Sequence, residues 1–233
     1  MTAQDAATDL GAAEALERLL RDRHSCRAFL PDPVDDAVIE RIIGIAQLTP
    51  SWCNAQPWRL IATRGAATER FRNALLEHTR KPEPQPDIPF PAAYHGVYQD
   101  RRRRCGFQLY DAVGVAHGDR EASGRQAREN FRLFGAPHVA IVTSDAALGT
   151  YGAVDCGAFV TSFMLAARTL GIASIAQAAL AGFSPFLHRY FDIPDDRIII
   201  CGISFGHEDS GHPANSFRTD RAPLAEVLDW CDV

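Results

Sequence analysis

Hydrophobic positions recur along the chain with two different spacings. Apolar residues with the spacing of one helix face predict helices over 12–23, 35–46 and 66–79, and a longer, more polar helical region over 97–134. Short runs rich in Ile, Val and Thr predict strands over 58–63, 138–143, 172–177 and 197–205. The stretch 81–91, KPEPQPDIPFP, carries five prolines, which exclude a helix or a central strand and predict a surface excursion.

The strongest helical pattern covers residues 151–170, which are apolar on almost every side and precede Gly171, where a helix end is expected. Small residues in its first half permit the close approach of another element: Gly152, Ala153, Cys156, Gly157 and Ala158. A helix at the centre of the core and a helix at a dimer interface both account for this pattern. A further short helix is predicted around 224–230.

These elements favour an α+β fold. Four short strands stand between long helices, which suits a mixed layer fold better than a regular parallel βαβ array. The chain has no internal repeat, no low-complexity linker and no break in composition. We therefore expect a single domain over residues 1–233, with 1–11 as a flexible N-terminal tail.

Composition narrows the class of protein. Apolar residues make up 46% and charged residues 23%, as in ordinary globular proteins. The net charge of −5 argues against a dedicated nucleic-acid binder, which needs a basic footprint. No stretch is read as a membrane helix, and the polar N-terminus lacks the pattern of a signal peptide. Six scattered cysteines without C-x-x-C spacing indicate a reduced, cytoplasmic protein.

Two short clusters of basic and hydroxyl residues lie at opposite ends of the chain. The first is RHSCR at 23–27, and the second is RTDR at 218–221. Arginine stays charged and donates hydrogen bonds in a planar fork that matches a phosphate. The two clusters could converge on one phosphate. The alternatives are a basic turn that satisfies the dipole of the first helix and solvated surface arginines.

The most unusual segment is PSWCNAQPW at 50–58, which places Ser, Asn and Gln between two prolines and two tryptophans. Prolines stiffen the loop, and the amides of Asn and Gln offer both donors and acceptors. That combination suits the mixed polar edge of a heterocycle such as the pyrimidine side of a flavin. The alternative is a turn whose side chains satisfy its own backbone.

Together these motifs resemble the FMN-dependent nitroreductase family. The chain carries R-H-S-x-R at 23–27, P-S-x-x-N-x-Q-P-W at 50–58, GIASIAQAAL at 171–180, and G-x-x-x-G at 202–206 followed by R-T-x-R-x-P at 218–223. The resemblance extends from about residue 12 to 230, and the stretch 88–110 is similar to the branch that contains nitrobenzoate reductases. It implies a small, mixed, mainly antiparallel sheet flanked by helices, in an interlocked homodimer with FMN at the subunit interface.

The resemblance also implies roles for individual residues. Arg23, His24 and Ser25 would hold the phosphate and ribityl end of FMN together with Arg218 and Arg221. Arg27 would lie near the pyrimidine edge, where a cation tunes the redox chemistry. The remaining cofactor residues implied by the family pattern are Pro50, Ser51, Asn54 and Gln56 from the second subunit, Gln177, Ala178, Ala179 and Leu180 along the ring, and Gly206 near the phosphate end.

A substrate pocket follows from the same resemblance. Trp52 and Cys53 stand where the family commonly has small residues, so they are candidates to reshape the pocket. The candidates to cap it are Phe107, Tyr110, Phe131 and Phe134, with core packing as the alternative. The family uses a ping-pong reaction in which NAD(P)H reduces FMN and an acceptor then takes the donor's place. A nitroaromatic acceptor is expected, with a quinone or an activated alkene as alternatives, and neither a catalytic side chain nor a metal is required.

The sequence also allows four alternative functions or sites. Gly202-Ile203-Ser204-Phe205-Gly206 matches the nucleophile elbow of a serine hydrolase, although the following segment reads as loop and the remaining chain offers no suitable acid and histidine in order. The segment 207–212 contains His, Glu and Asp that could bind a metal, but its spacing matches no common site. Four arginines at 101–104 form a solvated face, a nucleic-acid patch or a charge that attracts an anionic substrate. A non-catalytic flavin carrier is the remaining alternative.

Overall fold

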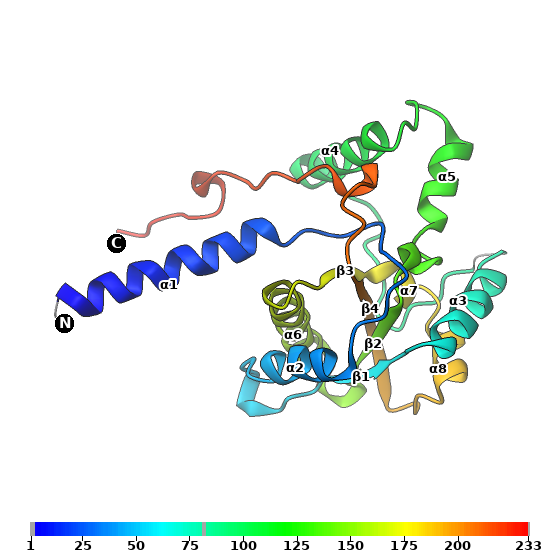
Figure 1. The fold of residues 1–233 in the computed structure, drawn as a ribbon, viewed down its shortest axis with the longest axis horizontal. Helices are drawn as coiled ribbons and strands as arrows, with labels where there is room; N and C mark the ends of the chain where they lie inside the picture. Colours follow the sequence, from blue (N-terminus) through cyan, green and yellow to red (C-terminus); the bar gives the residue numbers. More distant parts are fainter. Residues whose placement is uncertain (1–2, 81–82, 233) are drawn as a thin grey trace.

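A four-stranded antiparallel sheet forms the centre of the molecule (Figure 1). The computed structural model describes residues 3–80 and 83–232, with side chains from residue 11 onward. The strands follow the order β1-β2-β4-β3, with the bounds β1 Arg59–Ala62, β2 His138–Asp145, β3 Ala173–Gln177 and β4 Arg197–Gly206. An isolated parallel bridge joins Ser25 to Ser174 at the outer edge of β3. The small, mainly antiparallel sheet expected from the family resemblance is therefore confirmed.

Helices cover both faces of this sheet. On one face α2 (Asp36–Ala46) and α6 (Gly149–Thr169) pack against Ala140 and Val142 of β2. On the other face Val139 and Ile141 of the same strand meet α3 (Ala66–His78), α7 (Ala178–Ala181) and α8 (Ser184–Phe191). A strand buried on both faces needs apolar side chains at successive positions, which explains the unbroken run VAIV within β2.

One side of helix α6 packs against the core, and the other side is exposed. Seven of its residues are buried: Gly152, Cys156, Phe159, Val160, Phe163, Ala166 and Ala167. Tyr151 and Val154, on the opposite side, are about three-fifths exposed at 59% and 60%. By length and composition the stretch 146–169 could cross a membrane, although the sequence analysis predicted no membrane helix. Its packing against β2, β3 and α2 identifies it as a core helix of this fold.

The sequence placed several boundaries incorrectly. Helix α1 runs over Ala3–Asp22, so residues 3–11, expected to be a flexible tail, are helical; residues 1–2 lie outside the described part. The helical region expected over 97–134 divides into α4 (Gly96–Ala112) and α5 (Arg120–Arg128). The cause is a turn in which Gly114 and Gly118 have φ values of 71° and 86°, a conformation that other residues rarely adopt.

Two further differences concern the C-terminal half. No element was expected over residues 178–191, where α7 and α8 lie. The helix expected around 224–230 is a single 3₁₀ turn, Leu224–Glu226. Its apolar neighbours Val227 and Trp230 are 73% and 81% exposed, so no packing within the chain stabilises a short helix there.

The proline-rich segment lies on the surface, as expected. Its described residues, 83–91, are held to the body of the protein by hydrogen bonds. The amide of Gln85 donates to the carbonyl of Gly182 at 2.8 Å. The Asp87 carboxylate accepts from the amide of Ile199 at 2.7 Å and lies 3.1 Å from Nε2 of His188. These contacts hold residues 83–91 against α8 and the start of β4. Residues 81–82 lie outside the described part.

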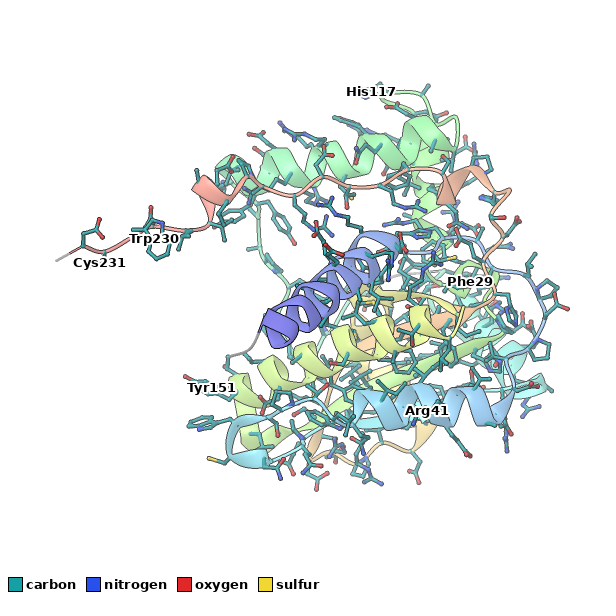
Figure 2. All side chains as sticks on the ribbon, turned by 60° about the vertical axis from the view of Figure 1, so that its left-hand side comes forward. Phe29, Arg41, His117, Tyr151, Trp230 and Cys231 are labelled. Atoms are coloured by element: carbon teal, nitrogen blue, oxygen red, sulfur yellow. The ribbon has the colours of Figure 1, made fainter. Side chains whose placement is uncertain are left out.

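Two segments extend away from this body, both toward the same side (Figure 1). One is α1, which exposes Leu16 and Leu20. The other is the C-terminal arm, residues 216–232, which passes α4 and carries Trp230 near its end (Figure 2). A single chain leaves these apolar side chains without cover, which points to a surface that another molecule occupies.

Candidate functional site

The two basic clusters meet at one cavity. The chain leaves α1 at Asp22, passes beside the edge strand β3, and lies against the C-terminal segment. A cavity of about 1040 Å³ opens between them. We call it the arginine cavity; its lining residues are Glu17, Leu20, Arg21, Arg23, His24, Ser25, Arg27, Cys105, Phe217, Arg218, Thr219, Asp220 and Arg221. The predicted convergence of the two clusters is therefore present in the fold.

One buried side chain holds these clusters together. Asn215 is 4% exposed, and its Oδ1 accepts a hydrogen bond from the amide of Arg27 at 2.7 Å. Its Nδ2 donates to the carbonyls of Ala28 and Asp209, both at 2.9 Å. The amide of Cys26 in turn donates to the carbonyl of Ser174. The sequence reading missed Asn215, because its partners are backbone groups far away in the chain.

The arginine cavity carries positive charge that no carboxylate neutralises directly. Among residues 11–80 and 83–232, whose side chains the structure describes, Arg23, Arg27, Arg218 and Arg221 form no ion pair. Arg218 and Arg221 donate to backbone carbonyls and to one threonine hydroxyl. Burial, followed by the charge of Arg221, lowers the pKa of Arg23. An anion bound between these guanidinium groups would relieve their mutual repulsion and be stabilised by charge-assisted hydrogen bonds.

Two neighbours in the RHSCR motif are oriented differently from the arginines. His24 lines the cavity, but its Nε2 lies 3.0 Å from the Glu208 carboxylate and its Nδ1 lies 3.3 Å from the carbonyl of Asp22. Cys26 points into the core, where burial raises the pKa of its thiol to about 12 and its Sγ donates to the carbonyl of Ala28. Ser25 and Arg27 are thus the members of the motif that continue toward the next cavity.

A second, smaller cavity of about 510 Å³ adjoins the first and shares Ser25, Arg27 and Cys105 with it. We call it the aromatic cavity. Its other lining residues come from α4, α5, β3 and the segments that follow α5 and β3: Arg102, Arg103, Gly106, Phe107, Leu109, Tyr110, Gln126, Ala127, Asn130, Phe134, Ile175, Ala176, Gln177 and Ala178. No Asp or Glu of the described chain is among them. A wall of apolar groups with a few polar ones suits a flat heterocycle.

Arg27 lies where the two cavities meet. Its guanidinium lies 5.5 Å from the ring centroid of Phe217, and Nη1 donates to the carbonyl of Ser25 at 3.2 Å. Burial lowers its pKa, with smaller opposing effects of Cys105 and Cys26. An arginine remains charged under such conditions, so Arg27 presents a fixed cation to both cavities.

Gln177 is fixed at the floor of the aromatic cavity by a buried network. The hydroxyl of Ser204 donates to its Oε1 at 2.5 Å, and its Nε2 donates to the carbonyl of Asn130 at 2.8 Å. Gln177 and Ala178 line the cavity as expected, whereas Leu180 is fully buried in the core. Ala179 and Gly206 line neither cavity.

The same network excludes the serine hydrolase. Ser204 is 0% exposed, lies inside β4, and gives its hydroxyl hydrogen to Gln177. A nucleophile elbow requires a sharp turn from strand to helix, but β4 continues through the whole GISFG motif to Gly206. Among the described residues, no group of three or more His, Cys, Asp or Glu side chains is arranged to hold a metal ion.

Three of the four aromatic candidates line the aromatic cavity: Phe107, Tyr110 and Phe134. Phe107 stacks on His117, with ring centroids 4.1 Å apart. Phe131 does not line the cavity; it packs in the core, where its ring meets that of Phe183 edge to face at 5.3 Å. In the single chain Phe131 is partly buried and packs against the core, which is the role that the sequence left as the alternative.

The loop 50–58 lies far from both cavities within the single chain. It follows α2 at the end of the molecule opposite α4 and α5 (Figure 1). Cys53, Asn54 and Gln56 have φ values of 51°, 55° and 47°, a left-handed conformation that is uncommon for residues other than glycine. Six residues expected at the site line neither cavity here: Pro50, Ser51, Trp52, Cys53, Asn54 and Gln56.

Contacts from α6 keep this loop in shape. The amide of Trp52 donates to the carboxylate of Asp155, with both oxygens at 3.2 Å. The Trp52 ring packs against Tyr151 with centroids 4.4 Å apart, at the exposed end of α6 (Figure 2). The Ser51 hydroxyl accepts from the amide of Gln56 at 2.9 Å. The loop is thus held in an unusual conformation while most of its side chains stay exposed.

Comparison with known proteins gives a consistent picture. Residues 20–207 match the model of the Nitroreductase family. The chain is 33% identical to a nitrobenzene nitroreductase of Ectopseudomonas oleovorans, over 91% of this chain and 94% of that protein. It is 31% identical to a 4-nitrobenzoate reductase of Pseudomonas putida, over 88% and 90% of the two chains.

A solved structure extends this similarity to three dimensions. The crystal structure of the FMN-dependent nitroreductase NfnB from Mycobacterium smegmatis, in complex with NADPH, superimposes with a TM-score of 0.90. The match covers 94% of this chain and 99% of the other at 32% sequence identity. By sequence and by fold, this chain belongs to the nitroreductase family.

Proposed function

We propose that this protein is a flavin enzyme that binds FMN and uses it to reduce nitroaromatic compounds with electrons from NAD(P)H. The observation that carries this proposal is the junction of the arginine cavity with the aromatic cavity at Ser25 and Arg27. One cavity suits a phosphate and the other suits a flat ring, and they adjoin as the two ends of FMN do. NfnB, which shares the fold, is FMN-dependent.

The residues of the arginine cavity fit the phosphate end of the cofactor. A phosphate monoester carries a charge of about −1.5 to −2 at neutral pH, and Arg23, Arg218 and Arg221 offer guanidinium groups that no carboxylate neutralises directly. We assign these three arginines and Ser25 to the phosphate. The ring of His24 is held by the Glu208 carboxylate, so we assign it to positioning.

The residues of the aromatic cavity fit the ring of the cofactor. Arg27 would face the pyrimidine edge, where a cation favours negative charge on the ring. Gln177 and Ala178 would lie along the ring, and the side chain of Gln177 is held away from it by Ser204 and Asn130. When bound, FMN would accept hydride from the nicotinamide and deliver it to the acceptor in alternating half-reactions.

The aromatic cavity offers one place for both the nicotinamide donor and the acceptor. Phe107 and Tyr110 on α4 line the side of the aromatic cavity opposite β3, so a nicotinamide ring or an aromatic acceptor would lie between them and the flavin. Because both ligands need this place, the kinetics would be ping-pong. The nitroaromatic class follows from the relatives, which act on nitrobenzene and 4-nitrobenzoate by name. A quinone or an activated alkene fits the same cavity.

We further propose a homodimer with a composite site, in the cytoplasm. The loop 50–58 exposes Asn54 and Gln56 far from the cavities of its own chain, which suits delivery to the site of a second copy. The exposed apolar residues of α1, α6 and the C-terminal arm suit the contact between copies. Trp52 and Cys53 would then approach the partner's acceptor from the loop.

The visible spectrum of the purified protein tests the central proposal. We expect flavin absorption bands that bleach on addition of NADPH or NADH and return with a nitroaromatic compound. Bands that stay unchanged with either nicotinamide would indicate a flavin carrier. A protein that does not retain flavin after incubation with FMN would contradict the proposal.

Substitution of the phosphate arginines tests the assignment of the site. In Arg23→Ala and Arg221→Ala we expect the FMN dissociation constant to rise about tenfold or more, because each change removes charge-assisted hydrogen bonds. Fluorescence titration of FMN-depleted protein measures it. Arg18→Ala, on the exposed side of α1 outside both cavities, is the matched control. Equal affinities in all three variants and the wild type would overturn the phosphate assignment.

A further inference from the structure

Helix α4 presents two arginines to the aromatic cavity. Arg102 and Arg103 line it together with Phe107 and Tyr110. Positions 103, 107 and 110 recur at the three- and four-residue spacing that places side chains on one helix face. The other two members of the run face elsewhere, because neither Arg101 nor Arg104 lines the cavity.

The charges of these two arginines are not compensated within the described chain. Arg101 is paired with Glu226 at 2.7 Å, but neither Arg102 nor Arg103 forms an ion pair with a described side chain, that is, within residues 11–80 and 83–232. The guanidinium of Arg102 lies 5.4 Å from the ring centroid of Tyr94, which orients it. Since no described Asp or Glu lines the cavity, its potential is positive.

Arg27, the third arginine that lines the aromatic cavity, has a different role. Arg27 lies at the junction with the arginine cavity and donates to the carbonyl of Ser25, so it faces the cofactor in the proposed function. Arg102 and Arg103 lie on α4, on the wall that carries Phe107. They are therefore placed to meet the second ligand of the cavity, and a cation that faces a ligand selects for negative charge.

We propose that Arg102 and Arg103 bind an oxyanion carried by the flat ligand that enters the aromatic cavity, while Phe107 and Tyr110 hold its ring. Two sources share this chemistry: the carboxylate of an aromatic acceptor and a phosphate of the nicotinamide donor. The inference rests on the proposed function, and it adds two specificity-determining residues to it. The names of the relatives do not decide it, because they include both a charged and an uncharged acceptor.

Binding of unreactive ligands tests the site without turnover. Benzoate and benzamide have the same ring and differ in charge, and calorimetry on the FMN-loaded protein measures their dissociation constants. We expect benzoate to bind about tenfold more tightly than benzamide in the wild type, as for one charge-assisted hydrogen bond at a partly exposed site. The preference should disappear in the Arg102→Gln/Arg103→Gln variant if the carboxylate is the source.

The matched control is Arg104→Gln, which removes the same charge from the same helix outside the cavity. This control also accounts for long-range electrostatic attraction. Any positive charge close to the aromatic cavity attracts anions over about one Debye length, which is about 8 Å at physiological salt. Equal FMN content in the three proteins shows that the exposed substitutions preserve the fold. We expect Arg104→Gln to keep most of the preference for benzoate.

A second measurement identifies a phosphate source. Stopped-flow absorption compares flavin reduction by NADPH with reduction by 1-benzyl-1,4-dihydronicotinamide, which carries no phosphate. If a donor phosphate binds here, the double variant should slow reduction by NADPH about tenfold at limiting donor and leave the neutral donor unaffected.

Two outcomes remain distinct. The oxyanion site is overturned if the double variant and Arg104→Gln show the same preference for benzoate over benzamide and the same rates of flavin reduction by NADPH and by 1-benzyl-1,4-dihydronicotinamide. If the wild-type flavin is not reduced by any donor, the proposed function fails, and the benzoate measurement still decides the fate of the site.

Discussion

The buried imidazole of His138 links three segments of the fold through its two nitrogens. Its Nε2 accepts from the amide of Val34 at 2.9 Å, and its Nδ1 donates to the carbonyl of Thr63 at 3.1 Å. Both bonds require the neutral ring, because a proton on Nε2 would face another donor. Burial accordingly lowers the pKa of His138 from its ordinary value.

This geometry predicts a loss of stability on the acid side. The unfolded chain takes up a proton at this residue near pH 6.5, the ordinary value, while the folded chain does so only at lower pH. Between these values the unfolded state binds more protons, so the free energy of unfolding falls as the pH decreases below about 6.5. Urea unfolding between pH 7.5 and pH 5 should show this slope, and His138→Gln should reduce it.

His188 provides a control of opposite sign. Burial lowers its pKa, but hydrogen bonds with the Ile193 carbonyl and the Asp87 carboxylate outweigh burial and leave the pKa raised. Its contribution is therefore complete at low pH and is lost as the pH rises through the folded value. His188→Gln should not flatten the acid slope. Parallel slopes for the wild type and His138→Gln would contradict the role of His138.

At the residue level the sequence predicted chemistry better than position. Arg23, Arg218 and Arg221 could be assigned to a phosphate only through the family resemblance, because a basic turn and solvated surface arginines account for the same residues. Asn215 could not be found, since its three partners are backbone groups of distant segments. Phe131 packs against the core and does not line the aromatic cavity of the single chain, and periodicity does not distinguish these two places.

At the level of elements, the turn between α4 and α5 shows what a hydrophobic pattern omits. The pattern continued through residues 113–119, but Gly114 and Gly118 adopt positive φ and end the first helix. Strand β2 was predicted almost correctly, because burial on both faces leaves a continuous apolar run. Helices α7 and α8 were missed, since α7 spans only four residues and α8 eight, too few to show a period.

The same turn offers a matched pair of substitutions. Gly118 has φ +86° and no heavy atom near the position of an added Cβ, so Gly118→Ala should cost about 1–2 kcal/mol of stability through backbone strain alone. Gly124 lies inside α5, also with open space around it. Gly124→Ala should instead raise stability by about 0.5–1 kcal/mol. Urea unfolding of both variants measures these changes, and shifts of the same sign would contradict this account.

For the whole molecule, the family resemblance predicted more than the residue pattern did. It implied the antiparallel sheet, which the structure contains, whereas alternating strands and helices alone left the strand directions open. The surfaces of α1, α6 and the C-terminal arm could not be anticipated from periodicity, because an apolar side chain is equally consistent with a core and an interface. Only the fold shows that Tyr151, Val154 and Trp230 lie outside the core.

The proposed composite site makes a prediction that depends on the assembly. If each flavin site takes its arginines from one copy and its loop from the other, then Arg23→Ala/Arg221→Ala and Asn54→Ala/Gln56→Ala damage different halves of the same site. Each variant dimer would then carry two damaged sites. A mixed dimer would carry one site with both defects and one site with none.

Mixed dimers can be purified after coexpression of the two variants with different affinity tags. We expect them to bind about one FMN per two chains with wild-type affinity, and to recover about half of the NAD(P)H-dependent activity, while both parental variants bind FMN weakly. Doubly tagged wild-type dimers provide the reference. If the loop served the cavity of its own chain, every site in the mixed dimer would keep one defect and no recovery would occur. The structure favours recovery, because no residue of the loop 50–58 lines the arginine cavity of its own chain.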